Sequence, residues 1–429
     1  MFSSVSYSIS AKISVILGAM IIAHARKPFC AVIGAGPAGL FAAETLACAG
    51  ADVCVYDHKP SPARKFLMAG RGGLNITHSE DLETFLARYG VASTPLASLI
   101  RAWPPQALRE FCADLGEETF IGSSGRVFPS SFKASPLLRA WLLRLKQLGV
   151  TLAMRHKFLG FSAQGLLQFQ RGDGEDLHLA ADAVILALGG ASWPKLGSDG
   201  AWTKLLEHQG ISLAPLHAAN CGALIEWGAF FQQTNEAKPI KNVRVWCEGA
   251  SGRGDLMITR TGLEGGPIYA LSSYLRRQIE AKTQAQLTID LRPDTSLESL
   301  TQKLAKRSPK QSQSTYLKRA GFHGPEIALL RETCSFPLPQ EAASLAHVIK
   351  NLELKVYGLA DLMRAISTSG GVLFDEVSAE LMLKKLPGVF VAGEMLDFDA
   401  PTGGYLLQAA FSTGFAAGRG AARYLGLQV

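Results

Sequence analysis

The chain has 429 residues, 48% of them apolar and 18% charged, with a net charge of +7. This composition excludes a mainly disordered chain, and the length predicts two or three domains. The charge is modest for this size and does not by itself indicate nucleic-acid binding, whereas 43 glycines exceed the usual share of about 7% and mark tight turns or close approaches to a ligand.

Residues 1–28 precede the first recognisable strand and are either a signal-like segment or a dispensable extension. Lys12, the apolar run 13–23 and Ala23-His24-Ala25 resemble a signal peptide with its cleavage site. The run is too short for a membrane-spanning helix, which needs about 20 residues. The seven cysteines are odd in number and contain no C-x-x-C pair, so neither a disulfide framework nor a metal site is expected. We therefore expect a cytoplasmic protein without stable membrane insertion.

Residues 29–57 have the pattern of one βαβ unit. A buried strand over 29–33 is followed by a glycine turn, a helix from Pro37 to about Ala49, and a second strand over 52–56. The apolar run 183–188 predicts a third buried strand, residues 389–392 a fourth, and a long helix begins near Gly403. These runs predict a parallel sheet with buried faces.

The remaining segments divide the chain into parts. Residues 84–156 are expected to be mostly helical, with breaks around Pro104-Pro105 and the Gly-Ser-rich stretch from Gly122 to Gly125. Short β-like segments at 222–225, 243–247 and 287–291 predict a separate, mainly β domain. The basic run from Lys303 to Lys318 is either a patch for an acidic partner or a solvated helical face. The predicted parts are 29–205 (nucleotide-binding domain, N-terminal part), 206–292 (inserted β domain), 293–350 (helical subdomain) and 351–429 (β return and nucleotide-binding domain, C-terminal part).

Gly34-Ala35-Gly36-Pro37-Ala38-Gly39 is a G-x-G-x-x-G motif between the first strand and its helix. The first glycine permits the turn, the second lets a pyrophosphate approach, and the third allows close helix packing. Asp57 lies 23 residues after Gly34, at the end of the second strand, where a carboxylate accepts ribose hydroxyls. A free 2′-hydroxyl indicates FAD or NAD rather than NADP.

A second glycine loop favours FAD, because a longer ligand must run past the sheet. It offers backbone amides, cations and few other side chains, and the residues that we predict to bind the cofactor there are Lys65, Arg71, Gly72, Gly73, Asn75 and Thr77. Gly189 follows the third strand. At the C-terminal end the predicted cofactor residues are Gly393, Glu394, Asp397, Gly403, Gly404 and Tyr405. A helix that starts after two glycines presents bare amides to the N1–C2=O edge of a reduced flavin.

These motifs, with Gly125-Arg126-Val127-Phe128-Pro129, the segment 254–259 and Ser369-Gly370-Gly371-Val372, resemble the BaiN/YhiN-like family of bacterial flavoproteins from residue 29 onward. The resemblance implies FAD bound to a discontinuous α/β Rossmann-like domain of the glutathione-reductase type 2, with an inserted β-barrel-like domain and a small helical subdomain. The chain departs from the family pattern in several places, and in the second glycine loop the arginine has moved to position 71. Leu74 stands where the family loop usually has cysteine, and Leu406 where it usually has asparagine.

The chain has one G-x-G-x-x-G after a strand, so a second resident NAD(P) site is not expected. We predict an FAD-dependent oxidoreductase that passes hydride from flavin N5 to an unsaturated small molecule, with NADH or NADPH as a transient donor and no nucleic-acid partner. Arg126 and Arg260 are candidate substrate residues, and no catalytic acid or base is assigned. The alternatives are an FAD-dependent tRNA-modifying enzyme, which needs a conspicuous basic surface, and a non-catalytic flavin-binding redox sensor.

Overall fold

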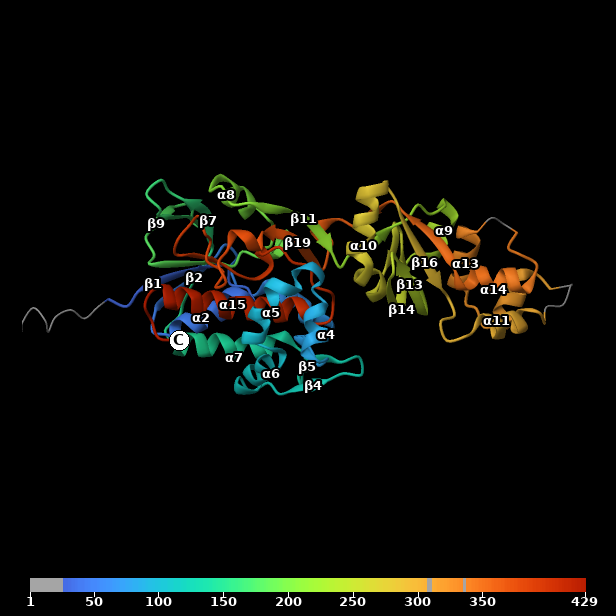
Figure 1. Ribbon diagram of the computed structural model, residues 1–429, viewed down its shortest axis with the longest axis horizontal. Coiled ribbons are helices and arrows are strands. Elements are labelled where there is room, and N and C mark those ends of the chain that lie inside the picture. Colours follow the sequence, from blue (N-terminus) through green and yellow to red (C-terminus); the bar gives the residue numbers. More distant parts are fainter. Residues whose placement is uncertain (1–25, 307–310, 335–336) are drawn as a thin grey trace, which may run out of the picture.

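The computed structural model describes residues 26–306, 311–334 and 337–429. Figure 1 shows two lobes side by side along the long axis. The larger lobe has a hydrophobic core drawn from residues 30–211 and 372–422, and the smaller lobe has its own core from residues 223–356. The signal-like run predicted at 13–23 lies outside the described residues.

A five-stranded parallel sheet forms the centre of the larger lobe. Its order is β20-β10-β1-β2-β6, so a strand from near the C-terminus pairs beside strands from the first half of the chain. All four pairings are parallel. The strands are β1 (Phe29–Ile33), β2 (Asp52–Asp57), β6 (Thr151–Met154), β10 (Ala183–Leu186) and β20 (Val389–Val391). The apolar runs that predicted buried strands at 29–33, 183–188 and 389–392 are thereby confirmed.

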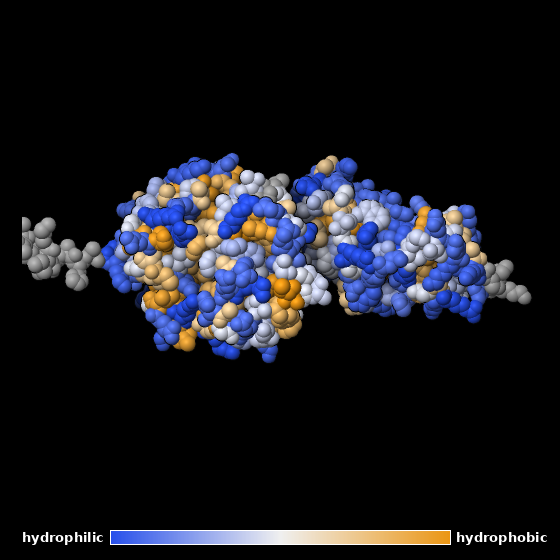
Figure 2. Space-filling view, turned by 60° about the horizontal axis from the view of Figure 1, so that its bottom comes forward, coloured by the Kyte–Doolittle hydropathy of each residue, from blue (hydrophilic) through white to orange (hydrophobic). Residues whose placement is uncertain are grey.

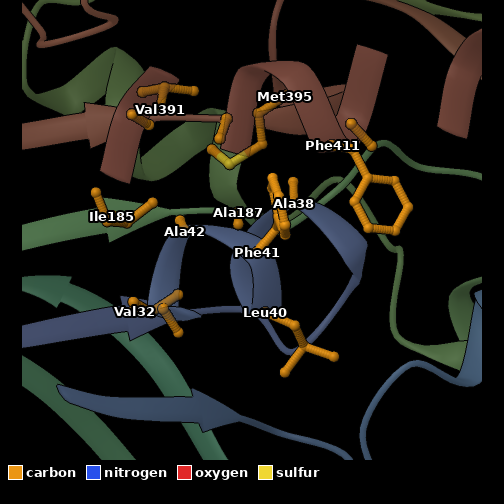
Figure 3. Packing of buried hydrophobic residues seen from close by; sticks show 14 of the residues in the cluster. Val32, Ala38, Leu40, Phe41, Ala42, Ile185, Ala187, Val391, Met395 and Phe411 are labelled. Carbon is orange, nitrogen blue, oxygen red and sulfur yellow. The ribbon is translucent and has the colours of Figure 1, made fainter. Parts of the chain in front are cut away.

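Two helices, α2 (Pro37–Cys48) and α15 (Tyr405–Tyr424), pack against each other next to this sheet. Small residues allow the close approach: a Cβ added at Gly414 of α15 would lie 2.4 Å from the carbonyl oxygen of Ala38 in α2. Figure 3 shows Ala38 and Phe41 of α2 beside Met395 and Phe411, and the rings of Phe41 and Phe411 are 5.3 Å apart.

The expectation of a mostly helical segment over 84–156 is confirmed, since helices cover more than half of it. A β-hairpin interrupts the helices at residues 119–129, because aromatic and β-branched residues flank a Gly-Ser-Ser-Gly turn. The elements of the larger lobe that complete it are α3 (Arg64–Ala69), β3 (Thr77–His78), α4 (Leu82–Ala87), α5 (Ser93–Ala102), α6 (Pro105–Asp114), β4 (Thr119–Ile121), β5 (Arg126–Pro129), α7 (Ala134–Gln147), β7 (His156–Phe161), β8 (Leu167–Arg171), β9 (Asp176–Leu179) and α8 (Trp202–His208).

The chain passes between the lobes along two antiparallel strands, β11 (Leu213–Ala219) and β19 (Ser367–Val372). Asn220, at the end of β11, donates from Nδ2 to Ser367 Oγ at 2.6 Å and to the carbonyl of Ala400 at 2.7 Å. Arg276 donates to Ser369 Oγ at 2.7 Å. These bonds tie the end of β11 to β19 and to the larger lobe, and β19 to the smaller lobe.

The smaller lobe contains a seven-stranded antiparallel sheet in the order β17-β16-β13-β14-β15-β12-β18. Its two edge strands, β17 and β18, are consecutive in the chain and only Tyr357 separates them. The sheet therefore curls, which brings its two edges close together. The strands are β12 (Ala223–Leu224), β13 (Pro239–Cys247), β14 (Ala250–Thr259), β15 (Gly262–Glu264), β16 (Ala285–Asp290), β17 (Leu352–Val356) and β18 (Gly358–Leu359).

Helices pack against this sheet, and residues of both form the hydrophobic core of the smaller lobe. The helices are α9 (Ala229–Asn235), α10 (Gly266–Lys282), α11 (Leu297–Leu304), α12 (Gln313–Arg319), α13 (Gly324–Thr333) and α14 (Ala342–Lys350). The predicted helical stretch after residue 293 is confirmed, whereas α10 was not expected within the β segment. Its apolar residues Ile268, Leu271 and Leu275 follow a helical period and are buried against the sheet. Within the described ranges, no helix is long and apolar enough to cross a membrane.

We expect Gly414→Ala to lower the stability of the protein. The new methyl group would collide with the carbonyl of Ala38, and such overpacking costs about 1–3 kcal/mol, more than the roughly 1 kcal/mol of helix propensity that alanine adds. Denaturant unfolding measures the change. Gly266→Ala is the control, because a Cβ there meets nothing within 4 Å. Equal unfolding midpoints for Gly414→Ala and the wild type would show that α15 is not held by this contact.

Candidate functional site

A cavity of about 540 Å³ lies at the carboxyl ends of the parallel strands, where open α/β sheets bind ligands. It collects segments that are far apart in sequence. The predicted cofactor residues that line it are Gly34, Gly36, Pro37, Ala38, Asp57, Lys65, Gly73, Asn75, Gly189, Gly393, Glu394, Gly403 and Gly404, and the candidate substrate residue Arg126 lines it too.

The three motif glycines have three different surroundings. A Cβ on Gly34, whose φ is +111°, would lie 2.1 Å from the carbonyl oxygen of Ala187, and one on Gly39 would lie 1.9 Å from that of Gly34. A Cβ on Gly36 meets nothing within 4 Å. Gly36 is the N-cap of α2 and provides no side-chain cap, so the first N–H groups of the helix are available to an anion at the cavity.

Asp57 is held in place by backbone donors. Its Oδ2 accepts from the N–H of Ala35 at 2.9 Å, and its Oδ1 accepts from the N–H of Lys59 at 2.8 Å. Each carboxylate oxygen has a further lone pair to offer. The carboxylate is therefore oriented at the cavity wall before any hydroxyl reaches it.

Ser198 is a residue of the cavity that the sequence reasoning missed. Its side chain is 6% exposed, and its Oγ has no hydrogen-bond partner among the described residues. A buried hydroxyl without a partner costs free energy, so this atom fits a site where a ligand completes its hydrogen bond. The available sequence signal was its neighbourhood, a Gly197-Ser198-Asp199-Gly200 turn after the third predicted strand.

Lys65 and Glu394 form an ion pair across the cavity wall. Lys65 Nζ donates to Glu394 Oε2 at 2.7 Å and to Ser192 Oγ at 2.6 Å. Glu394 Oε1 accepts from the N–H of Thr368 at 2.9 Å. The two predicted cofactor residues thus bind each other and connect segments 329 residues apart.

The opposite end of the cavity is formed by the start of α15. Gly403 and Gly404 have φ values of +125° and +96°, and a Cβ on Gly404 would lie 2.5 Å from the backbone nitrogen of Thr77. Gly404 is the N-cap and offers no side-chain cap. Arg126 is exposed, and its Nε lies 3.8 Å from the Cβ position of Gly403. A cation and a helix N-terminus therefore meet at one place.

Asn220, Ile366 and Ser367 also line the cavity, and sequence reasoning did not identify them. They belong to the connection between the lobes, so the cavity reaches the place where the lobes meet. No local motif marks them, because strands from distant parts of the chain bring them together.

Several predicted residues do not line the cavity: Gly39, Arg71, Gly72, Thr77, Asp397, Tyr405 and Arg260. Tyr405 points its hydroxyl away, donating to Glu80, and burial raises the pKa of that phenol. Thr77 Oγ1 donates to the buried Gln408 at 2.8 Å. Burial also raises the pKa of Asp397. Arg260 lies in the exposed turn between β14 and β15 of the smaller lobe.

The described residues contain no cluster of three or more His, Cys, Asp or Glu side chains that could hold a metal ion. All seven cysteines are free. Burial raises the pKa of Cys112 to about 12 and that of Cys221 to about 11, so neither thiol is ionised at neutral pH.

Comparison with known proteins identifies relatives along almost the whole chain. The chain is 26% identical to a 3-dehydro-bile acid delta(4,6)-reductase of Clostridium scindens, covering 91% of this chain and 98% of that protein. It is 25% identical to a ribosomal RNA dihydrouridine synthase of Escherichia coli, covering 90% of this chain and 96% of that protein.

The similarity to solved structures supports an assignment of the fold and nothing more. The crystal structure of a 3-ketosteroid-delta4-(5alpha)-dehydrogenase from Rhodococcus jostii matches with a TM-score of 0.50 and 15% identity, over 94% of this chain and 99% of that one. The family model described as the HI0933-like protein Rossmann domain matches residues 29–420, which include both lobes. The chain therefore belongs to the HI0933-like family of FAD-dependent Rossmann proteins.

Proposed function

We propose that the cavity binds FAD in an extended form, in a domain of the glutathione-reductase type 2 with a barrel-like insertion. The observation that carries this proposal is that one cavity contains Asp57, the uncapped start of α2 and the uncapped start of α15. The ribose would bind Asp57, the pyrophosphate would meet the amides after Gly36, and the flavin would lie beside Gly403 and Gly404. The partnerless hydroxyl of Ser198 supports a ligand at the same wall.

We further propose that the protein reduces a carbon–carbon double bond conjugated to a carbonyl group. Both relatives have names that denote such a reduction: one reduces a dehydro-bile acid, and the other makes dihydrouridine from uridine. In either case hydride adds to the β carbon, a proton adds to the α carbon, and the double bond is consumed. Reduced FAD would supply the hydride, and NADH or NADPH would restore the two electrons.

In this reaction, Arg126 would hold the carbonyl oxygen of the substrate. Negative charge develops on that oxygen as the β carbon receives hydride, and a guanidinium next to it stabilises the charge. Arg126 is suited to this role because it lies beside the start of α15, at the end of the cavity assigned to the flavin. Leu74, which stands at the family's cysteine position, is fully buried and has no proton to donate. The proton therefore has to come from water or from another group at the cavity.

The reaction is tested by anaerobic reduction of the bound flavin with NADH and with NADPH, followed by reoxidation with a panel of enones and free uridine. We expect bleaching by at least one nucleotide and reoxidation by a compound with a conjugated double bond. A flavin that bleaches but is reoxidised only by oxygen or quinones contradicts the reductase proposal, and a protein that retains and binds no FAD contradicts the cofactor proposal as well.

Ser198→Ala should separate cofactor binding from folding. Removing the partnerless hydroxyl leaves the stability of the FAD-free protein equal or higher, while the lost contact lowers FAD affinity by roughly 2- to 10-fold, the value of one neutral hydrogen bond. Thermal unfolding of the FAD-free protein and titration of flavin fluorescence measure the two effects. Ser123→Ala, in an exposed turn outside the cavity, is the control. Unchanged FAD affinity in Ser198→Ala would remove this residue from the site.

Arg126→Ala should slow reoxidation of the reduced flavin by the substrate about 10- to 100-fold, because a hydrogen bond to a charged group is lost. Reduction by NADH or NADPH should change little, and Arg126→Lys should restore part of the rate. Stopped-flow absorbance separates the two half-reactions. Arg260→Ala is the matched control, since this exposed arginine lies outside the cavity. Equal effects of the two alanine variants would refute the role of Arg126.

A further inference from the structure

The strands that connect the lobes bring a buried pair of polar side chains to the cavity. Ser367 begins β19 and is 2% exposed, Asn220 follows β11 and is 4% exposed, and both line the cavity. Figure 2 shows that the molecule narrows between the lobes, in the region that these two strands span in Figure 1. Ile366, the neighbour of Ser367, also lines the cavity and is 46% exposed, so solvent reaches the cavity beside the pair.

Hydrogen bonds from separate segments hold Asn220 in place. Its N–H donates to Ser272 Oγ at 3.1 Å, and its carbonyl accepts from the N–H of Ile366 at 3.4 Å. Its Nδ2 donates to both Ser367 Oγ and the carbonyl of Ala400. Its φ is +51°, a left-handed conformation in which asparagine is enriched among residues other than glycine. Such a conformation persists only where the surrounding structure determines it, and it is concentrated at functional sites. The direction of the Asn220 amide is therefore fixed.

The hydroxyl of Ser367 is hydrogen-bonded through its oxygen alone. Its Oγ accepts from Asn220 Nδ2 at 2.6 Å, and no residue that the structure describes accepts from its O–H. A serine hydroxyl has one hydrogen to donate and two lone pairs that accept. Because Nδ2 occupies one lone pair, the hydrogen remains available to a ligand in the cavity. A donor to Oγ also stabilises the negative charge that develops on this oxygen when the proton leaves.

The pair lies at the end of the cavity where Arg126 is found. Asn220 donates to the carbonyl of Ala400, and Arg126 Nε lies 3.8 Å from the Cβ position of Gly403. Three steps along the chain join Ala400 to Gly403, and they span at most about 11 Å. A guanidinium for the carbonyl oxygen of a substrate and a hydroxyl for its neighbouring carbon are therefore both anchored to one short loop.

We propose that Ser367 donates the proton that the α carbon of the substrate receives, and that Asn220 positions and activates the Ser367 hydroxyl. This inference rests on the proposed reduction of a conjugated double bond. Once hydride has bonded to the β carbon, the electron pair of the former double bond is shared between the α carbon and the carbonyl oxygen. That pair forms the new bond from the α carbon to the proton of Ser367, and the pair of the broken O–H bond stays on Oγ. Water that enters beside Ile366 then returns a proton to Oγ, and the hydroxide passes to solvent.

Three other polar side chains that line the cavity are less suited to this step. Asn75 is an amide without an acidic proton, and its Nδ2 donates to two backbone carbonyls. Arg126 does not deprotonate in a protein. Thr402 has a hydroxyl, but no residue in the described ranges donates to its oxygen, so no hydrogen bond from the protein stabilises an alkoxide there.

The test follows the hydrogen at the α carbon. The FAD-loaded protein is reduced anaerobically in heavy water and mixed with the enone of the panel that reoxidises it, and NMR of the product locates the deuterium. We expect the wild type to label one face of the α carbon. Ser367→Ala should be reoxidised about 100-fold more slowly, the lower value for a lost general acid, and should label both faces because solvent supplies the proton. Ser367→Cys retains a hydrogen to donate and should restore labelling of one face.

Ser369→Ala is the matched control, because Ser369 is buried on the same strand and lies outside the cavity. It should keep the wild-type rate and label one face. FAD affinity, measured by titration of flavin fluorescence, should be unchanged in Ser367→Ala, and thermal unfolding of the FAD-free variants verifies that they are folded. A loss of FAD affinity as large as the loss of rate would show that the hydroxyl binds the cofactor, which overturns the proposal.

Asn220→Asp tests the positioning role, since it keeps the shape of the side chain but replaces the donor with a carboxylate. It should slow reoxidation by about 10- to 100-fold, because a hydrogen bond to a developing charge is lost. In a Ser367→Ala background the same change should have no further effect, since Asn220 acts through the hydroxyl of Ser367. An equal further loss in both backgrounds would show that Asn220 is only structural.

The role of Ser367 and the proposed reductase activity fail separately. The role of Ser367 is refuted if enones reoxidise Ser367→Ala at the wild-type rate with label on one face, or if Thr402→Val labels both faces while Ser367→Ala does not. Either result leaves the reductase proposal standing. If no enone reoxidises the wild-type protein, the reductase proposal is refuted and the role of Ser367 with it.

Discussion

The site depends on a close approach of two backbone segments, the turn after β1 and the end of β10, which no side chain between them would allow. The carbonyl of Ala187, after β10, occupies the space of a Cβ on Gly34, and the carbonyl of Gly34 occupies that of a Cβ on Gly39. This contact fixes the turn after β1 against the end of β10. Close packing of α15 on α2 through Gly414 adds the C-terminal helix to the same unit. Two helix N-termini are thereby fixed around one cavity, although about 370 residues separate them in the chain.

Fixed backbone also explains how charge is arranged in the cavity. Neither helix start is capped by a side chain, so both direct free N–H groups and partial positive charge at a ligand. Asp57 is oriented by two backbone donors, and Lys65 is compensated by Glu394. Preorganised groups of this kind lose little conformational freedom when a ligand binds, which favours tight retention of a large cofactor.

The first βαβ unit could be predicted almost to the residue, because its signals are local: an apolar run, a glycine turn and a carboxylate at a fixed distance. Asn220 could not, since its place in the cavity arises from pairing between distant strands, whereas Ser198 had a local signal in its Gly197-Ser198-Asp199-Gly200 turn. The hairpin at 119–129 escaped notice because each strand has only three or four residues, too few to show alternation. Tyr405 shows the opposite error: its place in the motif suggested a cofactor contact, but it does not line the cavity and its hydroxyl donates to Glu80.

Two departures from the family pattern replace a polar side chain by leucine. Leu406 lines the cavity where the family usually has asparagine, and the buried Leu74 replaces a cysteine. Each change removes a side-chain donor, while Asn75, Asn220, Thr402 and Arg126 still line the cavity with polar groups. Both departures therefore exchange a polar side chain for an apolar one, and the polar groups that remain are contributed by segments far apart in the chain, from Asn75 to Thr402.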